Sequence, residues 1–296
     1  MEIKIFYSKD WQDYELLDTG EGEKLERFGP YTFVRPYENA VWPKTLGEKE
    51  WNNADGKFWS SKVGAKAGWT YKNEQSESLL KKWEMQYKGI KFFVSPTPFR
   101  HLGFFPEQAS HWDFIEDRIK KANRPIKFLN LFGYTGVASL FALRAGAEVT
   151  HLDASKQTLN WAKENQKLNA ELAEAPMRII EDDAIKFLER EAKRGNKYDA
   201  IIMDPPKFGR GPKGEVWKIE EMLPKLLSAV QKVLSDKPLF VILTSYAIDS
   251  SSLPLGYALD EMMKDFNGNT EAGELCVLEK SNNRIIPLAN TAVWSV

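Results

Sequence analysis

The chain of 296 residues has one cysteine, Cys276, and a single thiol can form neither an intramolecular disulfide nor a cysteine-rich metal site. We therefore expect no metal and a reducing compartment. Long hydrophobic runs are also missing, since no apolar stretch could span a bilayer. The first ten residues are interrupted by charges and lack the apolar core of a signal peptide. These absences predict a soluble cytoplasmic protein.

Neither sign of charge predominates, because 41 Lys and Arg residues stand against 42 Asp and Glu residues, for a net charge of −1. A global positive field that would attract nucleic acid is therefore excluded. A local basic patch remains compatible with this composition, since net charge does not describe how charges are distributed.

Short apolar–polar alternations fill the first hundred residues, and Gly and Pro interrupt them. The breaks at residues 20–22, 29–30 and 88–89 are typical of hairpin turns. We predict a small antiparallel β domain over residues 1–98. Six of the ten tryptophans precede residue 100, and they either fill the core of this domain or form one wall of a substrate cleft.

From residue 107 onward the pattern changes to alternating helices and strands. Helices are expected at 107–122, 136–146, 155–169, 183–194, 216–234 and 251–265, and strands at 127–132, 147–152, 177–181, 198–203 and 238–244. Such alternation predicts an α/β domain over residues 99–296, with a mostly parallel sheet and helices on both faces. Strands at 273–279 and 284–294 should close it as an antiparallel hairpin, because the turn between them is too short for a parallel crossover.

A glycine turn, with Gly133 and Gly136, follows the first strand of this domain. The glycines either let a ligand lie against the backbone at a helix N-terminus or serve only the turn. The full Gly-x-Gly-x-x-Gly spacing of dinucleotide-binding proteins is missing, which disfavours NAD and FAD. Asp153 ends the next strand, where a carboxylate can accept both hydroxyls of a ribose or cap the following helix. His151, in that same strand, is interpreted as a packed core residue.

Two acidic residues, Asp182 and Asp183, follow the third strand of this domain and precede Ala184. A carboxylate there can accept the amino group of an adenine while a neighbouring backbone N–H meets a ring nitrogen. The same residues can instead cap the helix that they open. Both interpretations stay open, and they are compatible with each other.

The segment Asp204–Phe208, with the sequence Asp-Pro-Pro-Lys-Phe, is the most specific one in the chain. Its prolines fix the backbone and supply no N–H, so the Pro205 carbonyl is expected to remain an unpaired acceptor. Asp204 and this carbonyl could together hold an amino group, and Phe208 offers a face on which a base can stack. The alternative is a rigid loop with a solvent-facing aspartate.

A basic loop is expected to continue from this segment over residues 208–214. Lys207, Arg210 and Lys213 can contact phosphates there, or they can be ordinary solvated cations on a mobile loop.

Four segments, Asn130–Gly136, Asp153–Ser155, Glu181–Ala184 and Asp204–Phe208, resemble the motifs of class I S-adenosylmethionine-dependent methyltransferases. They look most like the bacterial large-subunit rRNA methyltransferase group that carries Asp-Pro-Pro-Lys-Phe. Gly103–Gln108 resembles the segment that precedes the cofactor domain in that group. The resemblance extends over roughly residues 99–296 and implies a Rossmann-like sheet of the class I methyltransferase type.

The resemblance implies roles for individual residues. Those expected to bind S-adenosylmethionine are Phe105, Gln108, Asn130, Phe132, Gly133, Tyr134, Thr135, Gly136, Asp153, Ala154, Ser155, Asp182, Asp183, Ala184 and Asp204. Asp204, Pro205 and Phe208 would act on the methyl acceptor, and Pro206, Lys207 and Arg210 would contact the substrate, which the group implies is an rRNA-like RNA.

The sequence departs from that group in three respects. Members that methylate cytosine C5 use a cysteine after the fifth strand, and residues 243–247 contain none, so methylation of a nitrogen is expected instead. Cys276, in the expected closing hairpin, is interpreted as a small buried hydrophobe. Ala109 follows Gln108 where the group has arginine, and the first domain does not resemble the group's usual RNA-binding module.

The sequence thus predicts an S-adenosylmethionine-dependent methyltransferase that acts on RNA, with a protein acceptor as a second option. Two other classes remain as alternatives. One is a non-catalytic RNA-binding protein on the same fold, and the other is a nicotinamide-dependent oxidoreductase that uses the same turn and Asp153. The oligomeric state is not encoded in any pattern that we recognise.

Overall fold

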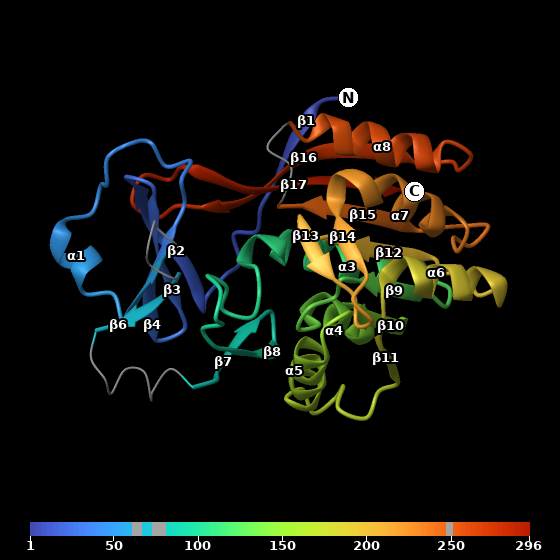
Figure 1. Ribbon diagram of the computed structural model, residues 1–296, viewed down its shortest axis with the longest axis horizontal. Helices are drawn as coiled ribbons and strands as arrows, with labels where there is room; N and C mark the ends of the chain where they lie inside the picture. The colour runs from blue at the N-terminus through green and yellow to red at the C-terminus, as the bar shows by residue number, and fades with distance from the viewer. Residues whose placement is uncertain (61–66, 73–80, 247–250) are drawn as a thin grey trace. The chain divides into compact units, whose positions relative to one another are not determined.

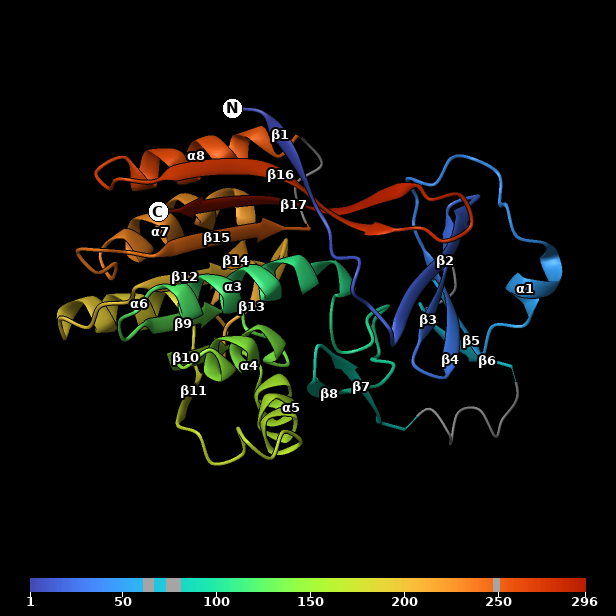
Figure 2. The ribbon, with the colours of Figure 1, turned by 180° about the vertical axis from the view of Figure 1, so that it is seen from behind.

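The computed structural model describes residues 1–60, 67–72, 81–246 and 251–296, and contacts group the chain into two compact units (Figures 1 and 2). The first unit contains residues 1–6, 110–275 and 287–296, and the second contains residues 7–109 and 276–286. The expected division into domains at residues 1–98 and 99–296 concerns which parts of the chain fold independently, and it stays a prediction.

The first unit is built on an eight-stranded sheet in the order β1-β16-β17-β15-β12-β9-β10-β11. Its strands are β1 (Ile3–Phe6), β9 (Lys127–Leu131), β10 (Glu148–Asp153), β11 (Met177–Glu181), β12 (Ala200–Met203), β15 (Phe240–Ser245), β16 (Asn269–Leu278) and β17 (Ile285–Ser295). The strands from β15 to β11 are parallel, and β17 is antiparallel to β15. The predicted α/β fold with antiparallel C-terminal strands is confirmed. The sequence did not predict β1, which pairs in parallel with β16.

Six helices pack against this sheet. They are α3 (Ala109–Lys121), α4 (Val137–Arg144), α5 (Lys156–Lys167), α6 (Ala184–Lys193), α7 (Ile219–Gln231) and α8 (Leu253–Met263). Figure 1 shows α6, α7 and α8 over one face, and Figure 2 shows α3 and α4 over the other. Each expected helix of this region is present, with ends that differ by a few residues.

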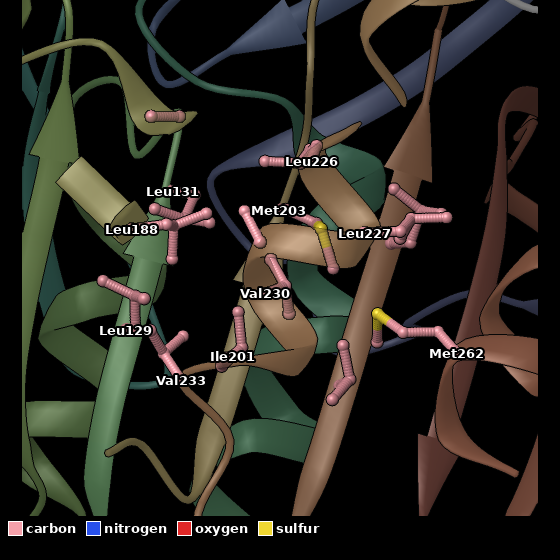
Figure 3. Close-up of a cluster of buried hydrophobic side chains, with 14 of the residues drawn as sticks. Leu129, Leu131, Leu188, Ile201, Met203, Leu226, Leu227, Val230, Val233 and Met262 are labelled. Atoms are coloured by element: carbon pink, nitrogen blue, oxygen red, sulfur yellow. The ribbon is translucent and has the colours of Figure 1, made fainter. Parts of the chain in front are cut away.

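An apolar layer between the sheet and helices α6, α7 and α8 forms a large core of the first unit (Figure 3). Its buried side chains include Leu129, Leu131, Leu188, Ile201, Met203, Leu226, Leu227, Val230, Val233 and Met262. Burying one such side chain stabilises a fold by roughly 1.5–3 kcal/mol. This layer therefore fixes β9 and β12 side by side, and the segments that leave their ends start from a rigid base.

The sequence placed the start of α7 too early, because Val216–Lys218 is a strand, β14, and not helix. β14 pairs in antiparallel fashion with β13 (Phe208–Arg210), so the mobile loop expected over 208–214 is a hairpin. The physical reason is a two-residue period: Trp217 is buried, while its neighbours Val216 and Lys218 are exposed.

The second unit is mostly antiparallel, as expected. Its strands are β2 (Tyr14–Gly20), β3 (Glu23–Phe28), β4 (Tyr31–Pro36), β5 (Gly56–Trp59), β6 (Gly68–Tyr71), β7 (Trp83–Tyr87) and β8 (Ile90–Val94), and its short helices are α1 (Glu48–Asn52) and η1 (Pro106–Gln108). Strands β2 to β6 form one sheet, in which only the β4–β5 pair is parallel among the strand pairs of the described residues, and β7 and β8 form a hairpin. The expected turn at Lys88-Gly89 has the positive φ values of 47° and 84° that such hairpins require.

Aromatic side chains fill the core of the second unit. The ring centroid of Trp11 lies 4.5 Å from that of Tyr87 and 5.7 Å from that of Phe104. Phe33 stacks on Trp83 with 6.0 Å between the ring centroids. The tryptophan-rich composition of this region is thus explained in good part by packing.

Residues 276–286 join the second unit through the tip of the β16–β17 hairpin. The backbone N–H groups of Lys280 and Ser281 donate to the carbonyls of Leu16 and Leu17, at 2.9 and 3.1 Å. Cys276 is free and buried, as expected. None of the helices in the described part of the chain is long and apolar enough to cross a membrane.

A buried ion pair lies in the second unit, where Arg35 holds Glu26 with two hydrogen bonds of 2.7 Å. Tyr14 donates to the same carboxylate at 2.9 Å, and Lys24 lies 3.2 Å from it. Burial by itself would raise the pKa of Glu26, but the charges of Arg35 and Lys24 outweigh it and lower the pKa to about 2. The carboxylate is therefore ionised at any physiological pH.

Replacing Glu26 by Gln would leave Arg35 buried without its main counter-ion. We expect the free energy of unfolding to fall by about 3–5 kcal/mol, as measured by urea denaturation. The control is Glu15→Gln, which breaks partly exposed pairs with Arg27 and Lys280 and should cost about 1 kcal/mol or less. Equal losses in the two variants would contradict the role of burial.

Candidate cofactor and acceptor site

Three strands of the large sheet end in register, and this alignment creates the candidate site. Leu131, the last residue of β9, pairs with Leu152 of β10 on one side and with Met203 of β12 on the other. The next residues along the chain, Phe132, Asp153 and Asp204, therefore emerge at one edge of the sheet. The strand order reverses direction between β9 and β12, and ligands of open α/β sheets bind at that point.

The turn after β9 has an unusual backbone. Phe132, Tyr134 and Gly136 have positive φ values of 57°, 52° and 84°. Non-glycine residues rarely adopt this region, and surrounding hydrogen bonds must hold them there. The Gly133 N–H donates to the Leu152 carbonyl at 2.8 Å, and the Gly136 N–H donates to the Gly133 carbonyl at 3.0 Å. The turn is therefore rigid before any ligand arrives.

Both glycines of this turn are required by what lies beneath them. A Cβ added to Gly133 would collide with the ring of His151, and one added to Gly136 would lie 2.9 Å from the Cβ of Ala162 in α5. Close packing is thus a reason for the glycines that the sequence did not reveal, and it leaves the outer side of the turn available to a ligand.

His151 is buried beneath the turn in a polar chain. Its Nδ1 lies 3.0 Å from the Ser139 hydroxyl, which accepts a 3.0 Å hydrogen bond from the Asn130 amide. Burial lowers the pKa of His151 to about 4, against the opposing charge of Asp153. The ring is therefore neutral near pH 7, and it is a packed core residue, as expected.

The Asp153 carboxylate ties the turn to the next helix. Its Oδ2 accepts the Tyr134 N–H at 2.9 Å, and its Oδ1 accepts the Ser155 N–H at 2.9 Å and the Thr158 hydroxyl at 3.0 Å. A carboxylate has about four lone-pair positions, so one remains on Oδ2. Ser155, and not Asp153, is the N-cap of α5. The remaining lone pair is available to a ribose hydroxyl, and the ribose role of Asp153 stays a prediction.

The two aspartates before α6 have separate partners. Asp183 is the N-cap of α6 and accepts the Lys186 N–H at 3.0 Å, so the capping interpretation holds for this residue. Asp182 pairs with Arg190 and accepts the Asp183 N–H at 2.9 Å. Asp183 also accepts the Phe187 N–H through its carbonyl at 2.9 Å, whereas the N–H groups of Ala184 and Ile185, at the first two helical positions, have no acceptor within the helix and can donate to a ring nitrogen.

The segment after β12 is held by a residue that the sequence did not single out, Trp217 of β14. Its indole N–H donates to the Pro206 carbonyl at 2.6 Å, and its ring packs edge-on against Phe132 at 5.1 Å. Trp217 therefore connects the turn after β9 with the segment after β12. Trp217 was missed because a helix was expected to start at residue 216, although the alternation of Val216, Trp217 and Lys218 is a strand signal.

The other acceptor candidates differ in exposure, and their roles stay predictions. Pro205 is buried, and its carbonyl accepts no hydrogen bond within the described part of the chain. Asp204 is half-buried, and Phe208 is 56% exposed. Pro206, Lys207 and Arg210 are exposed.

The remaining candidates fall into two groups. Asn130 and Thr135 are buried, and Ala154 lies between Asp153 and the Ser155 cap, all in the first unit. Phe105 and Gln108 belong to the second unit, where Phe105 packs against His101 at 4.9 Å and Gln108 ends η1. Their roles stay predictions. Across the described ranges, no cluster of His, Cys, Asp and Glu is arranged to hold a metal.

All three histidines are held neutral, because burial lowers the pKa of His151 to about 4 and the pKa values of His101 and His111 to about 3, from 6.5. Between these values only the unfolded chain binds the protons, so stability falls as the pH drops from about 6.5 towards 4. We expect the free energy of unfolding to be lower at pH 5 than at pH 7 by about 2 kcal/mol or more. Carboxylates titrate mainly below this window, so an unchanged value would contradict the assignment.

Two comparisons with known proteins point to one family. A family model described as S-adenosylmethionine-dependent methyltransferase matches residues 62–239. The crystal structure of an S-adenosylmethionine-dependent methyltransferase from Agrobacterium tumefaciens is 42% identical, with a TM-score of 0.92 over 99% of this chain and 93% of that one.

Curated relatives carry the name ribosomal RNA large subunit methyltransferase K/L. The protein from Shewanella frigidimarina is 34% identical over 149 residues, which is 50% of this chain and 20% of its own. The protein from Alteromonas mediterranea is 26% identical over 271 residues, which is 86% of this chain and 35% of its own. The chain thus spans only a fifth to about a third of the length of these two relatives. With more than half of its length matched by the family model, the chain belongs to the S-adenosylmethionine-dependent methyltransferases.

Proposed function

We propose that this protein binds S-adenosylmethionine at the ends of β9, β10, β11 and β12 and transfers the methyl group to a nitrogen of an RNA nucleotide. The observation that carries the proposal is the link through Trp217, which joins the turn after β9 to the Asp204–Phe208 segment. A donor pocket and an acceptor segment built on neighbouring strands suit a reaction that depends on positioning two reactants. The names of the curated relatives support ribosomal RNA as the substrate class, in the cytoplasm.

The residues of the first unit fit this cofactor. The free lone pair of Asp153 can accept a ribose hydroxyl, and the first turn of α6 with its Asp183 cap can meet an adenine. The turn after β9 lacks the third glycine that a pyrophosphate needs, and this cofactor has no phosphate. When bound, S-adenosylmethionine supplies an electrophilic methyl group on a positively charged sulfur.

The acceptor segment suits an exocyclic amino group. In this proposal Asp204 and the Pro205 carbonyl accept its two N–H groups and leave the nitrogen lone pair directed at the methyl group, while Phe208 stacks on the base. Methylation of cytosine C5 would need a thiolate nucleophile. Cys276 is the one cysteine, and it is buried. These features favour nitrogen over C5.

Two substitutions separate donor binding from transfer. Asp153→Ala should weaken S-adenosylmethionine binding by about 100-fold, because both the ribose acceptor and the anchor of Tyr134 are lost. Asp204→Ala, which removes one of many expected cofactor contacts, should keep that binding within a few-fold and lower turnover by about 100-fold or more. Calorimetry measures cofactor binding. Turnover is measured by the transfer of labelled methyl groups to RNA from cells that lack the protein.

The matched control for Asp153 is Thr158→Val, which removes one donor to the same carboxylate and should keep cofactor binding within a few-fold of wild type. Cofactor affinity that is unchanged in Asp153→Ala would refute the ribose role. If protein rather than RNA becomes labelled in the methyl-transfer assay, the acceptor is a protein and the proposed RNA substrate is wrong.

Trp217→Phe tests the link between the two segments. Phenylalanine keeps a ring against Phe132 but cannot donate to the Pro206 carbonyl. We expect turnover to fall about tenfold, roughly the value of one buried hydrogen bond, while the Kd of the cofactor stays unchanged. Trp294→Phe is the same change at a buried ring that packs against Phe266, and it should leave turnover unchanged. Equal turnover in Trp217→Phe and wild type would argue against the positioning role.

A further inference from the structure

The β13–β14 hairpin has two chemically different faces. Directly opposed residues of an antiparallel pair point to the same side, and the register pairs Phe208 with Lys218 and Arg210 with Val216. These four side chains therefore share one face, and they are exposed. Trp217, on the other face, is buried. Figure 1 shows the hairpin beyond the end of β12 and beside α7.

The exposed face combines apolar surface with positive charge. Phe208 and Val216 are 56% and 49% exposed. The side chain of Arg210 makes no ion pair within the described part of the chain, and Lys218 pairs only with the exposed Glu221. Residues 207–218 contain four cations and one carboxylate, in a chain whose net charge is −1. This is a local basic patch of the kind that the overall composition left open.

The hairpin is anchored at both ends. Trp217 fixes its base through the Pro206 carbonyl, and Glu215 near its tip pairs with Lys186 of α6 at 2.5 Å. The hydrogen bond from Lys186 lowers the pKa of Glu215 to about 2, so the carboxylate is charged and committed to that partner. A surface that is ordered before binding loses little entropy when a ligand arrives.

We propose that the exposed face of the β13–β14 hairpin binds the single-stranded RNA next to the methylated nucleotide. Phe208 and Val216 form an apolar platform on which a base can rest, and Arg210 and Lys218 contact the phosphates. This inference rests on the proposed function, because Phe208 also ends the acceptor segment. It adds that the substrate is unpaired at this position.

Single-stranded RNA suits this face better than the two other occupants with complementary charge. A duplex hides the faces of its bases, so it could use the cations but not the apolar platform. An acidic protein needs a total interface of about 1,000 Å² or more, which two three-residue strands do not supply. Unpaired bases with flexible phosphates need only a small platform and nearby cations.

The test compares Arg210→Glu and Val216→Glu with wild type in binding to a fluorescein-labelled single-stranded RNA of mixed sequence, measured by anisotropy. Each variant should bind about tenfold more weakly or worse, through loss of a phosphate contact in Arg210→Glu or of an apolar contact with a base in Val216→Glu. The dependence of log K on log salt should also become shallower by about 0.7 in Arg210→Glu. The same RNA annealed to its complement should bind wild type more weakly than the single strand does.

The matched control is Tyr257→Glu, at a 57% exposed position of α8 in the same unit, which should bind the RNA as wild type does. S-adenosylmethionine binding, measured by calorimetry, should be the same in all four proteins. If wild type binds the cofactor and methylates RNA while Arg210→Glu and Val216→Glu bind the single strand normally, the inference is wrong and the proposed function stands. Wild type that binds no single-stranded RNA, or prefers the duplex, also overturns the inference. Wild type that does not bind the cofactor refutes the proposed function itself.

Discussion

The carboxylate of Asp153 is the interaction on which the candidate site depends. It accepts hydrogen bonds from the turn after β9 and from the start of α5, so two backbone segments meet at one edge of the sheet. The turn needs this support, because Phe132 and Tyr134 adopt conformations that cost non-glycine residues of order 1–3 kcal/mol each. The Asp153 carboxylate orders the turn through these hydrogen bonds, and a lone pair on its Oδ2 can still accept a hydrogen bond from a ligand. One residue can therefore serve both the fold and the binding of a cofactor.

On the acceptor side, too, one side chain has two structural roles. Pro205 and Pro206, in the segment after β12, have no N–H, so these two residues cannot donate the usual turn hydrogen bonds. A side chain from β14 supplies the missing donor, and its ring reaches the turn on the neighbouring strand. The rigid proline backbone and the Trp217 indole thus set the direction of the Pro205 and Pro206 carbonyls. The Pro206 carbonyl accepts the hydrogen bond from the indole, and the Pro205 carbonyl remains available to a ligand.

Sequence patterns predicted the fold well because they reflect local periodicity. The parallel strands, their helices and the antiparallel end are all visible as apolar runs and turns, and the register that aligns Phe132, Asp153 and Asp204 follows from them. Interactions between distant segments could not be predicted in this way. β1 is four residues long and contains a lysine, and its partner β16 lies near the other end of the chain. Nor does any spacing reveal that Gly133 lies against His151 or that Trp217 turns towards Pro206.

The path of the chain between the two units has a consequence for synthesis. Residues 3–6 complete the sheet of the first unit, and residues 276–286 complete the second, although most of the second unit is made first. Domains generally fold in the order in which they leave the ribosome. Here the earlier-made unit must wait for the hairpin β16–β17, and its β2 edge stays unpaired until residues 276–286 have been made. Synthesis of the β16–β17 hairpin, rather than emergence of the residues that precede it, is then the event that allows both units to close.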